Sequence, residues 1–317
     1  VVESNIHHPT DTGLLADGVR VVTRTVQRLK KVLVFKTRFR NRMRMMKRRL
    51  MNLFKFLKGR KNKAKGKFNA AREEILSIAT AVWAEAMGVL QDLQAGRLRL
   101  KDPAASSGVL SVVALEAQLK HWLGLLAQVM AQTRTVLDGN VHIPDRLVSL
   151  FDPGARPIQK GKLFPGTEFG RKVLIQEAEK GLVTNYRAEE GNPPDQGFLD
   201  PALDQHKKLF GHDPTKLAAD RGFHAPGQDD KLHERGIPYV SIPVRGGKDG
   251  RRKRTERSAW FRALQRWRAG GEAKISLLKR KFGCRRTAVR GTASSGIWIG
   301  WGLIAHNLLL WSRLGGP

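Results

Sequence analysis

Cysteine is nearly absent from this chain of 317 residues, which contains a single one, Cys284. One cysteine excludes an intrachain disulfide framework and a zinc site built on several thiolates, and it fits a reducing compartment. The nine histidines show no paired metal-ligand spacing. Long hydrophobic runs are missing too, because the most apolar stretch, residues 297–311, is shorter than the ~20 residues of a membrane span. We expect this stretch to form a buried terminal helix, and we expect no membrane partner.

Acidic residues are also scarce. The chain has 28 Asp and Glu against 58 Lys and Arg, a formal net charge of +30. Such a surface attracts polyanions, and nucleic acid is the default partner. A ribosomal protein or a membrane-surface protein can share this balance, so the charge alone does not separate these classes.

The excess of positive charge is concentrated near the N-terminus, since no acidic residue occurs between Asp17 and Glu73. Within residues 38–67 the cations alternate with apolar residues that wrap too widely for a clean amphipathic helix. We expect this segment to lie along DNA phosphates. A solvated basic linker and a membrane-surface helix are the alternatives.

The chain changes character along its length. Residues 12–139 show helical periodicity, interrupted at glycine- and proline-containing breaks. Beyond them the pattern predicts a β-hairpin (171–177 with 182–188), a helix (201–210), a strand (217–219), a helix (228–234), a strand (239–244), a basic loop (248–254) and a long helix (260–282).

Two acidic residues stand out in the second part. Asp220 ends a short apolar run and is followed by Arg221, Gly222 and Phe223. Glu272 lies in the long helix, where Arg268, Glu272 and Lys279 share one line along the surface. A helix break at Gly270-Gly271 is the competing possibility. The apolar stripe expected to be buried on this helix consists of Trp260, Leu264, Trp267, Gly271, Ile275, Leu278 and Phe282.

These residues resemble the DDE transposases of bacterial insertion sequences. The helix of their last acid carries the pattern Y-x-x-R-x-x-x-E-x-x-x-x-x-x-K, which Arg268, Glu272 and Lys279 match, while Gln265 replaces the tyrosine. Asp220 and the three residues after it resemble the segment that carries the family's second catalytic acid. Further blocks match in the family's order: residues 1–11 (VVESNIHHPTD), Lys160-Gly161-Lys162, Glu168-Phe169-Gly170 and Ala305-His306-Asn307-Leu308.

The resemblance implies an α/β, ribonuclease-H-like fold with a large all-α insertion after the first strand. In that fold the acids on two strand ends and on the last helix converge at one edge of the sheet. The expected parts are a remnant of the first strand (1–11), a basic helical insertion (12–145), the catalytic domain (146–290) and an apolar C-terminal helix (291–317).

The resemblance further implies metal-dependent DNA cleavage and strand transfer. Asp220 and Glu272 would be the catalytic residues and would bind two Mg²⁺ or Mn²⁺ ions. The expected partner is DNA, bound by a homo-oligomer in the bacterial cytoplasm at the nucleoid. The expected DNA contacts are Arg268, Lys279, Arg221, Arg251, Arg252, Lys253 and Arg254.

The family's first catalytic aspartate lies a few residues before the segment that corresponds to Val1. We therefore expect an N-terminally truncated fragment with little or no activity. Asp11 and Asp17 do not replace that acid, since Asp11 falls in a turn or helix cap. The alternative function is a non-catalytic basic nucleic-acid-binding protein, and a ribosome-associated RNA-binding protein is a weaker third reading.

Overall fold

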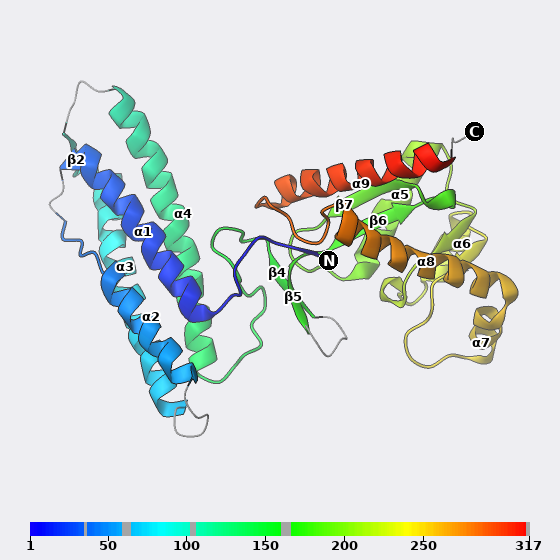
Figure 1. Ribbon diagram of the computed structural model, residues 1–317, viewed down its shortest axis with the longest axis horizontal. Helices are drawn as coiled ribbons and strands as arrows, with labels where there is room; N and C mark the ends of the chain where they lie inside the picture. The colour runs from blue at the N-terminus through cyan, green and yellow to red at the C-terminus, as the bar shows by residue number, and fades with distance from the viewer. Residues whose placement is uncertain (35–36, 59–64, 102–105, 160–165, 315–317) are drawn as a thin grey trace. The chain divides into compact units, whose positions relative to one another are not determined.

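The computed structural model describes residues 1–34, 37–58, 65–101, 106–159 and 166–314, and Figure 1 shows its ribbon. The chain divides into two compact units. One comprises residues 6–153, and the other joins residues 1–5 to residues 154–317. The boundaries between the two units follow residues 5 and 153, whereas the boundaries expected from the sequence follow residues 11 and 145. The Lys160-Gly161-Lys162 block lies outside the described residues.

Four long helices build the unit of residues 6–153. They are α1 (Asp11–Val32), α2 (Met43–Lys58), α3 (Lys65–Gln94) and α4 (Ser106–Leu137). Helix α1 packs against the other three (Figure 1). A short antiparallel ladder between β2 (Leu33–Val34) and β3 (Arg99–Leu100) belongs to the same unit, which is therefore not purely helical. One stripe of α1 at helical spacing forms the middle of the core: Leu15, Val19, Val22, Val26 and Leu29.

A buried ion cluster fixes the start of α1. Thr10 caps the helix, and its hydroxyl accepts a hydrogen bond from the backbone N–H of Gly13 at 3.1 Å. The carboxylate of Asp11 is almost fully buried and accepts hydrogen bonds from Arg146, at 2.7 and 2.8 Å, and from Gln132, at 3.2 Å. A buried carboxylate held in this way has a structural role, as expected for Asp11.

The strands of the second unit form three ladders that backbone hydrogen bonds do not join within the described residues. In the first, β5 (Thr167–Arg171) pairs antiparallel with both β1 (Val2–Glu3) and β4 (Arg156–Gln159). In the second, β6 (Val173–Glu177) and β7 (Val183–Ala188) form an antiparallel hairpin. In the third, β8 (Lys216–Ala218) and β9 (Tyr239–Ser241) run parallel.

Gly170 is required by the pairing of β1 with β5. A β-carbon on this residue would lie 2.0 Å from the carbonyl oxygen of Val2, far inside van der Waals contact. Because the obstacle is backbone, no side-chain movement can relieve it. This geometry gives a physical reason for the glycine in the Glu168-Phe169-Gly170 block.

The second unit contains the β-hairpin expected from the sequence, and the helices and strands that follow it come in the expected order. The hairpin turn places Lys180 and Gly181 at positive φ, 61° and 86°, which suits glycine. Three short 3-10 helices accompany the strands: Glu179–Gly181, Asp195–Phe198 and Arg221–Phe223. The α-helices are α5 (Leu199–Phe210), α6 (Gln228–Glu234), α7 (Gly250–Arg257), α8 (Ala259–Lys281) and α9 (Thr292–Leu314).

Three local expectations are wrong. Residues 250–257 form a helix instead of a loop, because Asp249 caps it by accepting a hydrogen bond from the N–H of Arg252. Strand β9 ends at Ser241, three residues earlier than expected. Helix α9 is not buried all round, because only one of its faces packs against the hairpin. No helix in the described part of the chain is long and apolar enough to cross a membrane.

Candidate catalytic site and nucleic-acid contacts

Asp220 lies directly beyond the parallel pair of β8 and β9. Its backbone is extended, and it precedes the 3-10 turn of Arg221–Phe223, where its carbonyl oxygen accepts a hydrogen bond from the N–H of Phe223 at 3.0 Å. About two thirds of its side chain, 66%, is exposed. The carboxyl ends of parallel strands are the usual location of ligand sites in open α/β sheets. The position of Asp220 agrees with that rule.

Glu272 lies in the second half of α8, which runs unbroken from Ala259 to Lys281. The helix therefore continues through Gly270 and Gly271, and the alternative of a break there is wrong. Ser258 caps its start, accepting a hydrogen bond from the N–H of Phe261 at 3.4 Å. The Glu272 side chain is 72% exposed, so its carboxylate is available to a ligand from solvent.

Arg268 links the two acids. Its guanidinium lies 3.9 Å from a carboxylate oxygen of Asp220 and 3.4 Å from one of Glu272. The arginine side chain itself is only 28% exposed, so the α8 face that carries it lies against the strand ends. Two carboxylates that are distant in the sequence therefore flank one cation at the end of β8.

Gln265 fixes α8 to the strands beneath these acids. Its side-chain amide donates to the carbonyl oxygen of Ser241 at 2.6 Å, to the hydroxyl of Ser241 at 3.0 Å, and to the carbonyl oxygen of Ala219 at 3.3 Å. Ser241 ends β9, and Ala219 precedes Asp220. The residue that replaces the family's tyrosine thus joins the helix of Glu272 to both strand ends.

The buried face of α8 differs from the stripe expected from the sequence. Phe261 and Leu278 are buried, whereas Trp267 and Ile275 are more than 40% exposed. The other members of the expected stripe, Trp260, Leu264, Gly271 and Phe282, are partly buried. The packed face extends from them toward Gln265 and Arg268, which are also partly buried.

Two lysines extend the cationic character along α8. Lys279 lies two helical turns beyond Glu272 on the same side of the helix and is half-buried. Lys274 forms an ion pair with Glu177, at the end of β6, and donates to the carbonyl oxygen of Gly181 at 2.7 Å. The contact of Lys274 is not visible in the sequence pattern, because it depends on a turn that is remote in the sequence.

Helix α7 carries the four consecutive cations expected to contact DNA, and the structure separates one of them from the rest. Arg252 donates to Glu256 at 3.1 Å, pairs with Asp229, donates to the carbonyl oxygen of Ile242, and stacks over the ring of Phe261. Its side chain is 14% exposed. It therefore holds α7 onto the unit. Among the predicted DNA contacts of this region, Arg221, Arg251, Lys253 and Arg254 are exposed.

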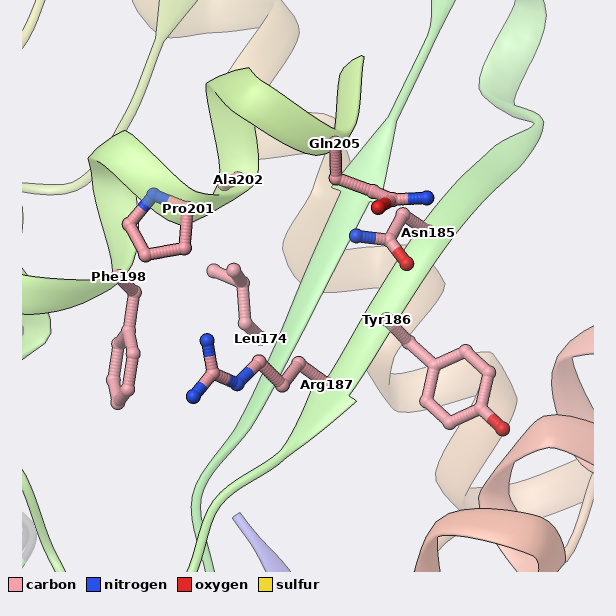
Figure 2. Close-up of a pocket in the computed structure, with 8 residues that line it drawn as sticks. All are labelled: Leu174, Asn185, Tyr186, Arg187, Phe198, Pro201, Ala202 and Gln205. Atoms are coloured by element: carbon pink, nitrogen blue, oxygen red, sulfur yellow. The ribbon is translucent and has the colours of Figure 1, made fainter. Parts of the chain in front are cut away.

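A small cavity of about 190 Å³ lies elsewhere in the unit, between the hairpin and α5. Figure 2 shows its lining, with Arg187 and Leu174 near Phe198 and Pro201, while Tyr186 points away from them. None of the residues predicted for the site lines this cavity. The side chains of Asp220 and Glu272 are 66% and 72% exposed, so both carboxylates are accessible to a ligand from solvent.

The pair of acids fits part of the ligand shell of a hard divalent cation. Mg²⁺ prefers carboxylate oxygens and retains several water molecules, so it is often held by one or two carboxylates plus substrate phosphates. Across the described ranges, no group of three or more His, Cys, Asp or Glu residues is arranged to hold a metal ion. Asp220 and Glu272 thus offer a partial shell, completed by water or by other ligands.

In a comparison with known protein families, the family described as Transposase DDE domain matches residues 141–308. That range contains both acids, Arg268 and Lys279. No curated protein and no solved structure matches this chain. The match covers more than half of the 317 residues, and its family implies a ribonuclease-H-like fold, in agreement with the mixed α/β structure. The chain belongs to the transposase DDE domain family.

Proposed function

We propose that this protein is a transposase that cleaves and joins DNA strands with the help of divalent metal ions, and that Asp220 and Glu272 are its catalytic carboxylates. The supporting observation is the shared contact with Arg268, at 3.9 and 3.4 Å, which brings these acids together at the end of β8. Family membership supports transposition as the biological process.

In this proposal the two acids hold Mg²⁺ or Mn²⁺ against a DNA phosphate. A bound pair of metal ions would supply an activated water or hydroxyl and would stabilise the departing oxygen. Asp220 and Glu272 would hold the ions, and Arg268 would donate to the phosphate once the metal neutralised the carboxylates. A guanidinium suits that contact because it can donate two parallel hydrogen bonds to phosphate oxygens.

The cations around the acids supply the remaining DNA contacts of this unit. Arg221 adjoins Asp220, Lys279 continues the line of Glu272, and Arg251, Lys253 and Arg254 project from α7. Such residues fix the position of the backbone without reading the sequence. Arg252 is left out of this set because its guanidinium holds α7 in place.

The helical unit offers a second DNA surface on α2. Arg44, Lys47, Arg48 and Lys55 are exposed on one side of this helix, and no acidic partner faces them among the described residues. Arg42 and Arg49, in contrast, pair with Glu85 and Glu74 of α3. The structure thus divides the basic segment into cations that hold the fold and cations that remain available to phosphates.

Iron-mediated cleavage of the protein tests the metal site. Fe²⁺ replaces Mg²⁺ at carboxylate sites, and with ascorbate and peroxide it cuts the nearby backbone. We expect cuts close to both Asp220 and Glu272, and we expect Glu272→Gln to abolish both, because one ion touches both segments. Glu234→Gln, in exposed α6, is the matched control and should leave the pattern unchanged. Cuts at only one of the two segments would contradict a shared metal.

Strand cleavage and DNA binding separate the proposed function from its alternative, a non-catalytic nucleic-acid-binding protein. The described acids make up only a partial ligand shell, so we expect weak nicking of DNA that carries the element's ends, with Mn²⁺ more effective than Mg²⁺. Glu272→Gln should remove this activity and leave DNA affinity unchanged or slightly higher. Loss of binding together with cleavage would assign Glu272 a structural role and favour the alternative.

A further inference from the structure

The outer face of α9 is a continuous apolar stripe. Ile297, Trp301, Ile304, Leu308 and Trp311 are each at least half exposed, and the two tryptophans reach 68% and 69%. A soluble chain seldom leaves two tryptophans and three aliphatic side chains exposed side by side, and such a patch marks an interaction surface. Burial within one unit does not explain why residues 297–311 are so apolar, whereas an exposed interaction stripe does.

The opposite face of α9 is firmly packed, so the exposed stripe is a property of a well-anchored helix. Leu303 and Ile299 are buried against the hairpin. The side-chain amide of Asn307 bonds both backbone groups of Val183, accepting at 3.0 Å and donating at 2.7 Å. Gly300 lies directly against the Tyr186 ring. The helix therefore cannot rotate to bury its outer face without losing these contacts.

The spacing of the stripe is that of a helix-to-helix seam. Its five members follow one another at intervals of four, three, four and three residues, which is the a/d pattern of two heptads. The other large exposed apolar side chains of the described residues come singly or in pairs. The described chain therefore offers one surface of matching shape and chemistry, namely the same helix of a second copy.

Charge supports the same partner. The protein carries a net charge of +30, so most of its surfaces repel a second copy. Helix α9 contains one charged residue, Arg313, which lies away from the stripe. Two copies can therefore approach through this helix without placing like charges opposite each other.

The area is sufficient for a specific dimer. Two tryptophans and three aliphatic side chains at these exposures present roughly 600 Å² of apolar surface per copy. Two copies would bury about 1,200 Å², which is the lower bound of a standard interface. Tryptophan is enriched among the residues that dominate the binding energy of interfaces.

We propose that the Ile297–Trp311 stripe of α9 is a self-association surface, through which two copies of this chain form a symmetric helix-to-helix dimer in the absence of DNA. A lipid surface fits less well. Helices that lie on membranes carry Lys and Arg on their polar face, whereas the second face of α9 is packed against the hairpin. The inference concerns assembly and is independent of the DNA reaction.

Cysteine cross-linking tests the dimer at single-residue level, because the native Cys284 is buried. Ile304→Cys places one exposed thiol at the centre of the stripe, and Leu209→Cys places one on an exposed apolar position of α5 as the control. With copper–phenanthroline as oxidant in high salt, we expect Ile304→Cys to form a covalent dimer and Leu209→Cys to remain largely single. Equal cross-linking of the two variants would overturn the proposal.

Sedimentation of the uncross-linked protein gives the second readout. We expect the wild-type chain to sediment at twice the chain mass at micromolar concentration, and Leu308→Glu to sediment as a single chain. Leu209→Glu makes the same substitution at a comparable exposure, 51% against 56%, and should stay dimeric. An unchanged circular dichroism spectrum verifies the fold of each variant. A single-chain wild type, or wild-type protein that pellets with neutral phosphatidylcholine vesicles while Leu308→Glu does not, would refute the proposal.

Discussion

Asp220 and Glu272 share one partner, because the guanidinium of Arg268 lies within 4 Å of a carboxylate oxygen of each. The arrangement depends on two structural supports: the parallel β8–β9 pair that ends at Asp220, and the unbroken helix α8. A cation between two acids lowers their mutual repulsion while the site is without metal. The same cation is then placed to meet a phosphate that arrives with the metal.

Gln265→Leu should lower the free energy of unfolding by about 1–3 kcal/mol, because it removes the amide that donates to the carbonyl oxygens of Ala219 and Ser241, of which Ser241 keeps only the backbone hydrogen bond from Ala219. Urea denaturation measures the change. Arg266→Leu, at the next position on the exposed side of α8, should change stability by less than about 0.5 kcal/mol. Equal effects of the two substitutions would show that the Gln265 amide does not hold α8 to the strands.

Two glycines of α9 should respond in opposite directions to alanine. At Gly302 a β-carbon would lie 2.5 Å from the carbonyl oxygen of Phe282, so Gly302→Ala should destabilise by about 1–3 kcal/mol. At Gly296 no atom lies within 4 Å, so Gly296→Ala should stabilise by about 0.5–1 kcal/mol through its higher helix propensity. Thermal or urea denaturation gives both changes in the free energy of unfolding. Changes of the same sign would contradict the close approach at Gly302.

The Glu85–Arg42 pair should make stability depend on pH. Side-chain hydrogen bonds from Arg42 hold the pKa of Glu85 below its ordinary value. A lowered pKa contributes stability that is present above the unfolded-state pKa and is lost as the pH falls through the folded-state value.

Glu85→Gln should therefore cost about 1–2 kcal/mol near neutral pH, and the difference from wild type should shrink as the pH falls below ~4. Urea denaturation across this pH range provides the measurement. Glu73→Gln, on the exposed side of α3, serves as the control for the substitution itself. A constant difference between Glu85→Gln and wild type at every pH would rule out the ionic origin of the effect.

The exposed cations of α2 should contribute to the salt dependence of DNA binding. Each phosphate contact adds about 0.9 to the slope of log affinity against log salt. Arg44→Gln with Arg48→Gln should therefore reduce the slope by about 2 and weaken binding at low salt. Lys120→Gln with Arg134→Gln removes the same charge from the exposed side of α4, and its slope should change less. Fluorescence anisotropy with a duplex measures both, and identical slopes would assign α2 no specific contact.

Much of the fold followed from local patterns. The hairpin was predictable from two alternating runs around Lys180-Gly181, and α8 from apolar residues at helical spacing. Helix α7 was not, because a run of charged residues shows no apolar periodicity. Its stability comes from the Asp249 cap and from the contacts of Arg252 with Glu256 and Asp229, of which only Asp229 is remote in the sequence.

The acidic residues of the candidate site could be named from the sequence, whereas the residues that hold them in place could not. Arg268, Glu272 and Lys279 could be placed on one side of a helix from spacing alone. The role of Gln265 could not be predicted, because its partners Ala219 and Ser241 come from strands that only the tertiary structure brings together. The exposure of the outer stripe of α9 cannot be predicted for a similar reason, since hydropathy shows that residues are apolar and does not show what covers them.

The contact between Asn307 and Val183 also bears on aggregation. An unpaired strand edge is a template on which another extended chain can add. The backbone N–H and the carbonyl oxygen of Val183 are both hydrogen-bonded to the side-chain amide of Asn307, as they would be to a neighbouring strand. The edge of β7 is therefore already hydrogen-bonded at Val183, and Asn307→Leu would leave these two backbone groups open to pairing with another extended chain.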